Sequence, residues 1–173
     1  LSEFFHDRYK NFMKEKEIRN DIIESITLDY NIDSILKIYK KTITLNKLIS
    51  KEIGKDLMFS YKRASNIIVN ELKNNKIELT GSADPGLFKN EFEIILYKKI
   101  HEIRKDFTNI GKDEDYEGIL KTLSLAKKEV NDFFENVIVN DQDELIKKNR
   151  LELLQMLCKT FDNYLNFSKV ESL

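Results

Sequence analysis

The residues of this chain that could bind a ligand lie along one expected helix, residues 56–72. An aromatic ring, two cations and two amides recur there at helical spacing, opposite the apolar residues: Phe59, Lys62, Arg63, Asn66 and Asn70. Unpaired RNA bases are held by stacking and by hydrogen bonds to their exposed edges, and this set supplies a ring, fork-shaped donors and amides. From composition alone, a solvated charged face is the favoured interpretation, and Phe59 packed under a neighbouring helix is a further alternative.

Two polar residues, Asn149 and Arg150, interrupt an otherwise apolar helix face near the C-terminus. Apolar side chains recur around them at three- and four-residue steps: Ile146, Leu153, Leu154, Leu157, Phe161 and Leu165. Arg150 therefore needs carboxylates or carbonyls, because burying a guanidinium without partners is costly. The preceding run, residues 137–140, favours an extended strap with free carbonyls, because its β-branched residues alternate. We expect Asn149 and Arg150 to form a structural clamp rather than a ligand site.

The pair His6 and Asp7 is of the type that HD hydrolases use to hold a metal. The only other histidine, His101, is not followed by an aspartate at matching spacing, and one ring with one carboxylate does not complete a metal's coordination. No Ser-His-Asp or Cys-His pairing and no glycine-rich phosphate loop can be assembled either. We therefore expect no catalytic residue and no metal site, and we interpret His6 beside Asp7 as a surface pair.

A second candidate metal site is the acidic run that starts at Asp113. Asp113, Asp115 and Glu117 alternate before Gly118, as in the first half of a calcium loop. The twelfth position is Ser124, where such loops carry a bidentate glutamate. We interpret the run as a solvated charged turn.

Bulk composition favours one all-helical domain over residues 1–173. The chain has one proline, five glycines and 41% hydrophobic residues, enough for one substantial core. With 29 basic and 30 acidic residues, any RNA contact must come from a local patch. No apolar run approaches the roughly 20 residues that span a bilayer, so no membrane contact is expected. The single Cys158 permits no internal disulfide, which fits a reducing cytoplasm.

Hydrophobic periodicity predicts a bundle of about seven helices, with the strap at residues 137–140 before the last one. The expected elements are 2–16, 20–27, a helix from Asp33 to Ile49, 56–72, 87–107, 116–134 with a bend midway, and a last helix reaching Leu165. Gly54 is expected to end or kink the chain, and Gly111 to close the fifth helix. Asp84 and Pro85 are expected to start the fifth helix. Asp141 is expected to cap the last helix and Glu144 to complete a capping box.

Several short motifs resemble those of one known family. They are Phe133-Phe134, Val137-x-Val139, Asp143-Glu144, Asn149-Arg150-Leu151, Leu153-Leu154, Asp7-Arg8, Arg19-x-Asp21-x-Ile23 and Lys62-Arg63-x-x-Asn66-Ile67. Together they cover nearly the whole chain, which resembles the C-terminal, DALR-like anticodon-binding domain of bacterial glycyl-tRNA synthetase β subunits. The chain departs from the family pattern at Leu145 and Lys147, and at Asn140-Asp141.

The resemblance implies an all-helical domain that binds the anticodon of tRNA for glycine, with no cofactor and no DNA partner of its own. It also implies a longer parent β chain that partners a synthetase α subunit and uses ATP and magnesium; Leu1 in place of Met fits a piece of such a chain. With the resemblance, RNA binding at residues 59–70 becomes the preferred hypothesis. A helical scaffold without RNA contact is the main alternative, and an HD-type metal enzyme is the third.

Overall fold

The computed structural model describes residues 2–26, 35–74, 77–110 and 114–171. These residues form eight α-helices and two short 3-10 turns, η2 (Pro85–Leu87) and η4 (Phe167–Lys169), and no β-strand. The helices are α1 (Ser2–Glu15), α2 (Asn20–Ser25), α3 (Ile35–Ile49), α4 (Glu52–Asn74), α5 (Glu91–Ile110), α6 (Tyr116–Ser124), α7 (Lys127–Asn136) and α8 (Glu144–Asp162). The expected all-α class is confirmed.

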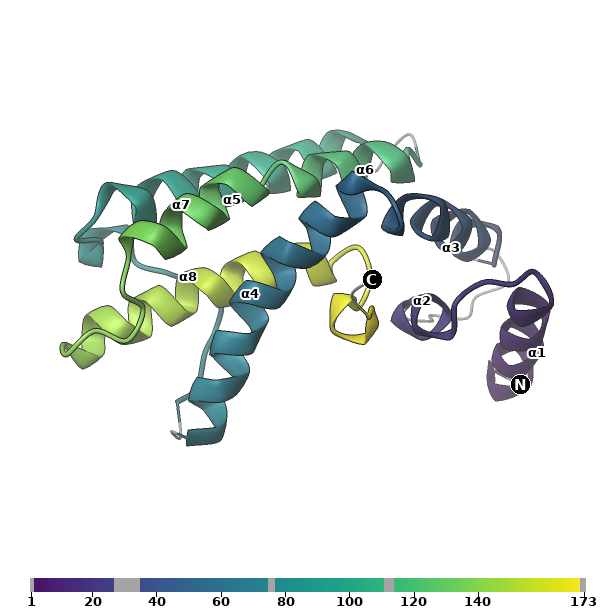
Figure 1. The fold of residues 1–173 in the computed structure, drawn as a ribbon, viewed down its shortest axis with the longest axis horizontal. Helices are drawn as coiled ribbons and strands as arrows, with labels where there is room; N and C mark the ends of the chain where they lie inside the picture. Colours follow the sequence, from purple (N-terminus) through teal and green to yellow (C-terminus); the bar gives the residue numbers. More distant parts are fainter. Residues whose placement is uncertain (1, 27–34, 75–76, 111–113, 172–173) are drawn as a thin grey trace.

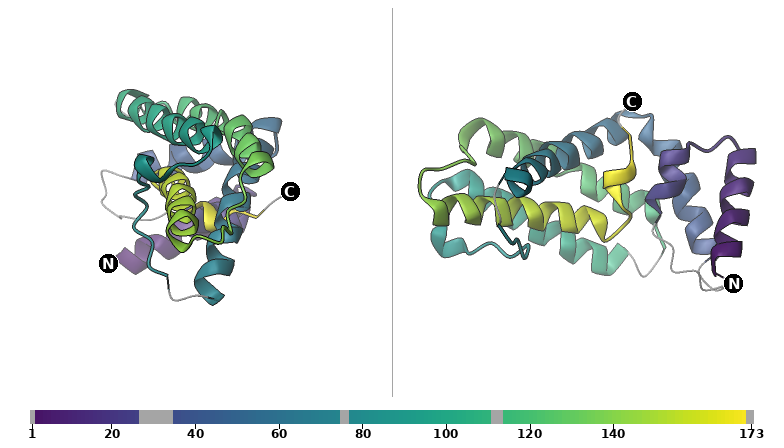
Figure 2. Two further views of the ribbon diagram at one scale, coloured as in Figure 1. Left: turned by 90° about the vertical axis from the view of Figure 1, so that its left-hand side faces the viewer. Right: turned by 90° about the horizontal axis from the view of Figure 1, so that it is seen from below.

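Helix α8 forms the centre of the larger part of the fold. Its apolar residues Leu153, Leu154, Leu157 and Phe161 are fully buried. Helices α4 and α5 both pack against it, α4 running obliquely to it, while α6 and α7 lie along α5 (Figure 1). Helices α1, α2 and α3 gather at one end of the elongated molecule, and α3 joins them to α4 (Figure 2). The α4 face expected to bind RNA therefore belongs to a helix held on several sides.

The cap of α8 differs from the expectation, and the predicted capping box between Asp141 and Glu144 is wrong. Asp143 is the N-cap: its Oδ1 accepts from the backbone N–H of Leu145 at 2.9 Å and of Ile146 at 3.4 Å. Asp141 is already engaged, because its carboxylate accepts from the N–H of Asp143 and from Arg150. The capping residue is the acid directly before the helix, as the geometry of an N-cap requires.

Helix α5 begins four residues later than expected. Asp84 does cap the turn at Pro85, accepting from Gly86 N–H at 2.8 Å, but that turn is the short η2. The helix itself starts with a capping box: Asn90 Oδ1 accepts from Phe92 N–H at 2.9 Å, and Glu93 Oε2 accepts from Asn90 N–H at 2.8 Å. This reciprocal pair satisfies more of the helix's first donors than Asp84 can, and it fixes the start.

The expected sixth helix bends midway, and the bend divides it into α6 and α7. At the break, the N–H of Leu125 and of Ala126 bond three residues back rather than four, to Thr122 and Leu123. Gly54 lies inside the first turn of α4, so the expectation that it ends a helix is wrong; the break falls at residues 50–51. A Cβ on Gly54 would collide with the Ile49 carbonyl, which explains the glycine. The expectations for Thr27, Asp33 and Gly111 lie outside the described residues.

Candidate nucleic-acid interface

Helix α4 presents two faces of opposite character. Its inward residues Leu57, Ala64 and Ile68 are buried, because the helix packs on α8 and on α6. The residues expected to bind RNA lie on the other side. Among them Asn66 and Asn70 are exposed, Phe59 is 37% exposed, and Lys62 and Arg63 are half-buried.

The structure turns Arg63 toward α7 and brings Phe59 beside it. The Arg63 guanidinium carbon lies 4.5 Å from the ring centre of Phe134 and 5.5 Å from that of Phe59. Its Nη1 also donates to Asn131 Oδ1 at 3.2 Å. The Arg63 guanidinium is thus held by intramolecular contacts with two aromatic rings. Arg63 is therefore less available to a ligand than its neighbours on the face.

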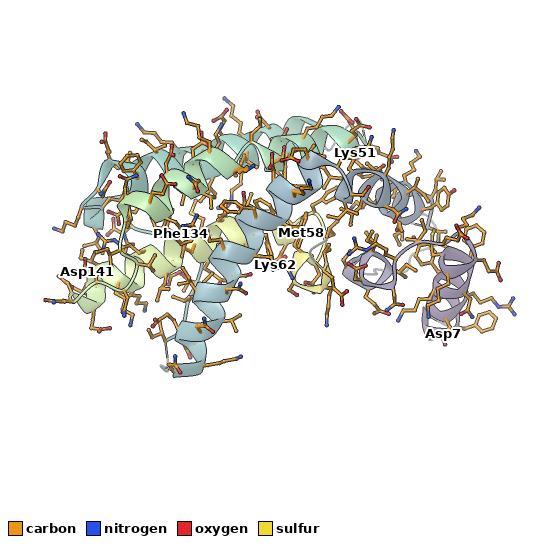
Figure 3. All side chains as sticks on the ribbon, in the orientation of Figure 1. Asp7, Lys51, Met58, Lys62, Phe134 and Asp141 are labelled. Carbon is orange, nitrogen blue, oxygen red and sulfur yellow. The ribbon has the colours of Figure 1, made fainter. Side chains whose placement is uncertain are left out.

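Lys62 and Asn66 line a groove on the opposite flank of α4, between that helix and α8. The groove has a volume of about 370 Å³, and α8 and η4 contribute Gln155, Asp162 and Ser168 to it. Figure 3 marks Lys62 on α4 and Phe134 on α7. The predicted set thus divides: Lys62 and Asn66 line the groove, Arg63 packs against Phe134 of α7 with Phe59 beside it, and Asn70 is exposed.

Gln155 is a residue of this groove that the sequence analysis did not single out. It lies between Leu154 and Met156 on a helix whose face was expected to be wholly inward, and it is half-buried. The only signal was a polar residue next to the apolar stripe. Asp162, at the end of the same helix, accepts from the Tyr61 hydroxyl and from Phe167 N–H, each at 3.2 Å. Burial raises the pKa of its carboxyl above the ordinary value.

Arg150 joins three segments at the other end of α8. Its Nη1 donates to the Ile138 carbonyl of the strap at 2.8 Å and to Asp141 at 2.6 Å. Its Nε donates to Glu93 at 3.0 Å, and the Glu93 side chain is completely buried. The strap carbonyl was an expected partner, whereas both carboxylates were not foreseen.

Asn149 and Glu152 hold the chain that precedes α5. The Asn149 amide accepts from Asp84 N–H at 2.7 Å and donates to the Asp84 carbonyl at 2.9 Å, so it contacts this turn and not the strap. The Glu152 carboxylate accepts from the backbone N–H groups of residues 80, 81 and 82. Three backbone donors on one carboxylate hold this segment of chain closely against α8. These bonds are of the kind that fix a loop.

The candidate metal residues are scattered. Asp7 is exposed on α1, at the opposite end of the molecule from Asp141 (Figure 3), and the His6 side chain lies outside the described part. His101 packs its ring 4.5 Å from that of Tyr97. In the described ranges no group of three or more His, Cys, Asp or Glu side chains could hold a metal ion.

The calcium-like run forms the start of α6, as far as the structure describes it. Asp113 lies outside the described residues. Asp115 caps α6 by accepting from Gly118 N–H at 2.9 Å, and Glu117 pairs with Lys121 at 2.8 Å.

Lys147, one of the positions at which the chain departs from the family pattern, is buried and forms an ion pair with Glu71 of α4 at 2.9 Å. No described helix is long and apolar enough to cross a membrane.

Comparison with known proteins identifies the class to which this helical fold and its α4 face belong. The chain belongs to the DALR anticodon binding domain family, whose model matches residues 57–173. The match begins inside α4 and includes the whole groove, whereas α1, α2 and α3 precede it.

The relatives belong to one enzyme subunit. The chain is 34% identical over 168 residues to the glycine–tRNA ligase beta subunit of Rickettsia prowazekii (strain Madrid E) and 33% identical over 171 residues to that of Rickettsia canadensis (strain McKiel). These alignments cover 96% and 98% of this chain but only 24% of each relative. The chain therefore spans about a quarter of the length of the relatives that it matches.

Proposed function

We propose that residues 1–173 are the anticodon-binding domain of a glycine–tRNA ligase β chain, and that they hold the anticodon loop of tRNA for glycine. Membership of an anticodon-binding family and near-complete alignment with glycine–tRNA ligase beta subunits support this proposal. In it, the chemistry of aminoacylation, with its ATP and magnesium, belongs to other parts of the enzyme, including the α subunit. The enzyme works in the cytoplasm, where its tRNA is found.

The observation that carries the proposal is the outward face of α4. Lys62, Asn66 and Asn70 form no hydrogen bond or ion pair through their side chains within the described part of the chain, although neighbouring charges are widely paired. Amides and a cation left without partners on a rigid helix can bind bases and phosphates at little cost in ordering. Phe59 keeps 37% of its surface exposed beside them.

Because the chain has a formal net charge of −1, RNA affinity has to depend on this local set. In the full-length ligase, replacing Lys62→Ala together with Arg63→Ala is expected to weaken binding of tRNA for glycine by roughly tenfold or more. A matched control is Lys98→Ala with Lys105→Ala, which removes the same charge from exposed positions of α5. Fluorescence anisotropy with labelled tRNA gives the affinities, and circular dichroism melting monitors folding.

The control variant should bind like the wild type. Equal losses in both double variants would show that only overall charge matters, and would remove the α4 face from the site. If the wild-type ligase binds tRNA for glycine no better than an unrelated tRNA, the proposed function itself fails.

A further inference from the structure

We infer that the groove between α4 and α8 takes one unstacked base of the anticodon, and that it prefers cytosine to uracil. The inference rests on the proposed function and goes further by assigning a subsite and its specificity. At about 370 Å³ the groove lies at the small end of ligand pockets, which run from roughly 300 to 1,000 Å³. Such a space suits one base rather than a stack of several.

The groove offers both surfaces that a single base needs. Val69 and Leu72 of α4 line it and remain 46% and 44% exposed, so they provide an uncovered apolar wall for the face of a ring. Lys62 and Gln155 contribute polar groups from the two different helices, α4 and α8. Neither side chain has a hydrogen-bond or ion-pair partner among the described residues. Unsatisfied donors and acceptors beside an apolar wall are what an unstacked base requires.

The charges in the groove favour a base over a phosphate. Among the described residues that line it, Lys62 is the single cation, and the Asp162 carboxylate lines the same space. A phosphate would meet repulsion from that carboxylate, whereas the amino group of cytosine is a donor and is attracted to it. The Tyr61 hydroxyl, 3.2 Å from Asp162 Oδ2, fixes the orientation of the acid.

Selectivity between the two pyrimidines follows from the fixed polarity of Lys62. A carboxamide such as Gln155 both donates and accepts, and by turning over it matches the edge of cytosine or of uracil. An ammonium group only donates. Cytosine presents two adjacent acceptors, N3 and O2, whereas uracil carries a hydrogen on N3. Lys62 therefore favours cytosine, and Gln155 strengthens the binding of either base.

Glycine codons begin with two guanines, so the anticodon of tRNA for glycine carries two cytosines that can fill such a subsite. The test uses the full-length ligase and two series of tRNA for glycine, one unchanged and one with a single anticodon cytosine replaced by uracil at either position. Lys62→Met keeps the length of the side chain without its charge, and Gln155→Ala removes the amide. Lys55→Met is the matched control, because Lys55 is exposed on the same helix outside the groove and outside the predicted RNA-binding set. Affinities come from fluorescence anisotropy.

The wild type is expected to prefer the unchanged tRNA by roughly tenfold or more at one position. Lys62→Met should clearly reduce this preference, Gln155→Ala should weaken both tRNAs similarly, and Lys55→Met should leave the preference unchanged. Wild-type affinities for Lys62→Met and Gln155→Ala overturn the subsite while leaving the proposed function standing. Equal wild-type affinities for the two tRNAs overturn the preference for cytosine, and an equal loss for both tRNAs in Lys62→Met overturns the assignment of that preference to Lys62. If the wild type binds no tRNA, the proposed function fails instead.

Discussion

Arg150 is the residue on which the C-terminal half of the fold depends most. Its guanidinium binds the Ile138 carbonyl and Asp141 of the α7–α8 connection and the completely buried Glu93 of α5. Removing it takes the Arg150 donor away from the buried Glu93 Oε1 and from the Ile138 carbonyl. Arg150→Ala is therefore expected to lower the free energy of unfolding by about 3 kcal/mol, as measured by urea denaturation.

Arg150→Lys is the informative comparison for that experiment. Lysine keeps the charge but has no planar fork that can reach Glu93 and the Ile138 carbonyl together. We expect it to recover part of the lost stability. An Arg150→Ala variant as stable as the wild type, but with weaker tRNA binding, would place Arg150 in the RNA surface and contradict its structural role.

Asp141 gives this network a dependence on pH. The hydrogen bond from Asp143 N–H, and then the Arg150 guanidinium, hold the pKa of its carboxyl below the ordinary value of 3.8. A lowered folded-state pKa contributes stability above pH 3.8, and this contribution is lost as the pH falls through the folded-state pKa. The wild type should thus be more stable than Asp141→Asn at pH 6, with the difference shrinking below pH 3.8. Urea midpoints measured across this range test the prediction, and a constant difference would contradict it.

The contacts of Arg150 show which residue-level features could be predicted from sequence. The strap carbonyl was foreseeable, because Ile138 lies only 12 residues before Arg150 in a run that cannot easily form a helix. Glu93 and Asp84 lie 57 and 65 residues from the α8 residues that bind them. A single sequence contains no signal that pairs residues so far apart. For these distant contacts, the sequence predicts only that the buried polar residues of α8 need partners.

At the scale of elements, the junction between α3 and α4 depends on Gly54. Glycine inside a helix is usually less stable than alanine by roughly 0.5–1 kcal/mol, so the ordinary expectation for Gly54→Ala is a gain. Here a Cβ would collide with the backbone carbonyl of Ile49, which cannot move without shifting α3. We predict a loss of roughly 1–3 kcal/mol in the free energy of unfolding.

Asn70→Ala, at an exposed position of the same helix, is the control for that change. Its side chain has no partner among the residues that the structure describes, and alanine is the better helix former, so this substitution should leave the stability equal or slightly higher. Thermal melting of both variants shows whether Gly54→Ala lowers or raises the stability. Stabilisation by Gly54→Ala would show that the junction has room for a methyl group.

Helix existence was predictable for a physical reason, and helix ends were not. The apolar stripes of α4, α5 and α8 are long, so their periodicity alone identifies them. Ends depend on which of several nearby polar residues reaches the free N–H groups. Asp143 rather than Asp141 caps α8, and Asn90 with Glu93 rather than Asp84 caps α5. Asp141 and Asp84, which were expected to cap these two helices, each bind another partner instead.

On the scale of the whole molecule, the predicted RNA face lies away from the buried side of α4, but it does not form a single surface. Helical spacing identifies residues that share a face, and Lys62 and Asn66 do line one groove. Spacing does not reveal what the neighbouring helices cover. Packing of α7 beside α4 engages Arg63 with Phe134, and α8 brings in Gln155. Neither contact can be inferred before the helices are assembled.

The central claim, that this domain reads the anticodon of tRNA for glycine, is tested most directly by changing the RNA alone. The measurement is the affinity of the full-length ligase for tRNA for glycine, compared with the same tRNA in which both anticodon cytosines are replaced by uracil. Because both molecules have the same charge and stem structure, any difference reports contacts to the bases. We predict that the substituted tRNA binds at least roughly tenfold more weakly. Equal affinities would contradict the claim.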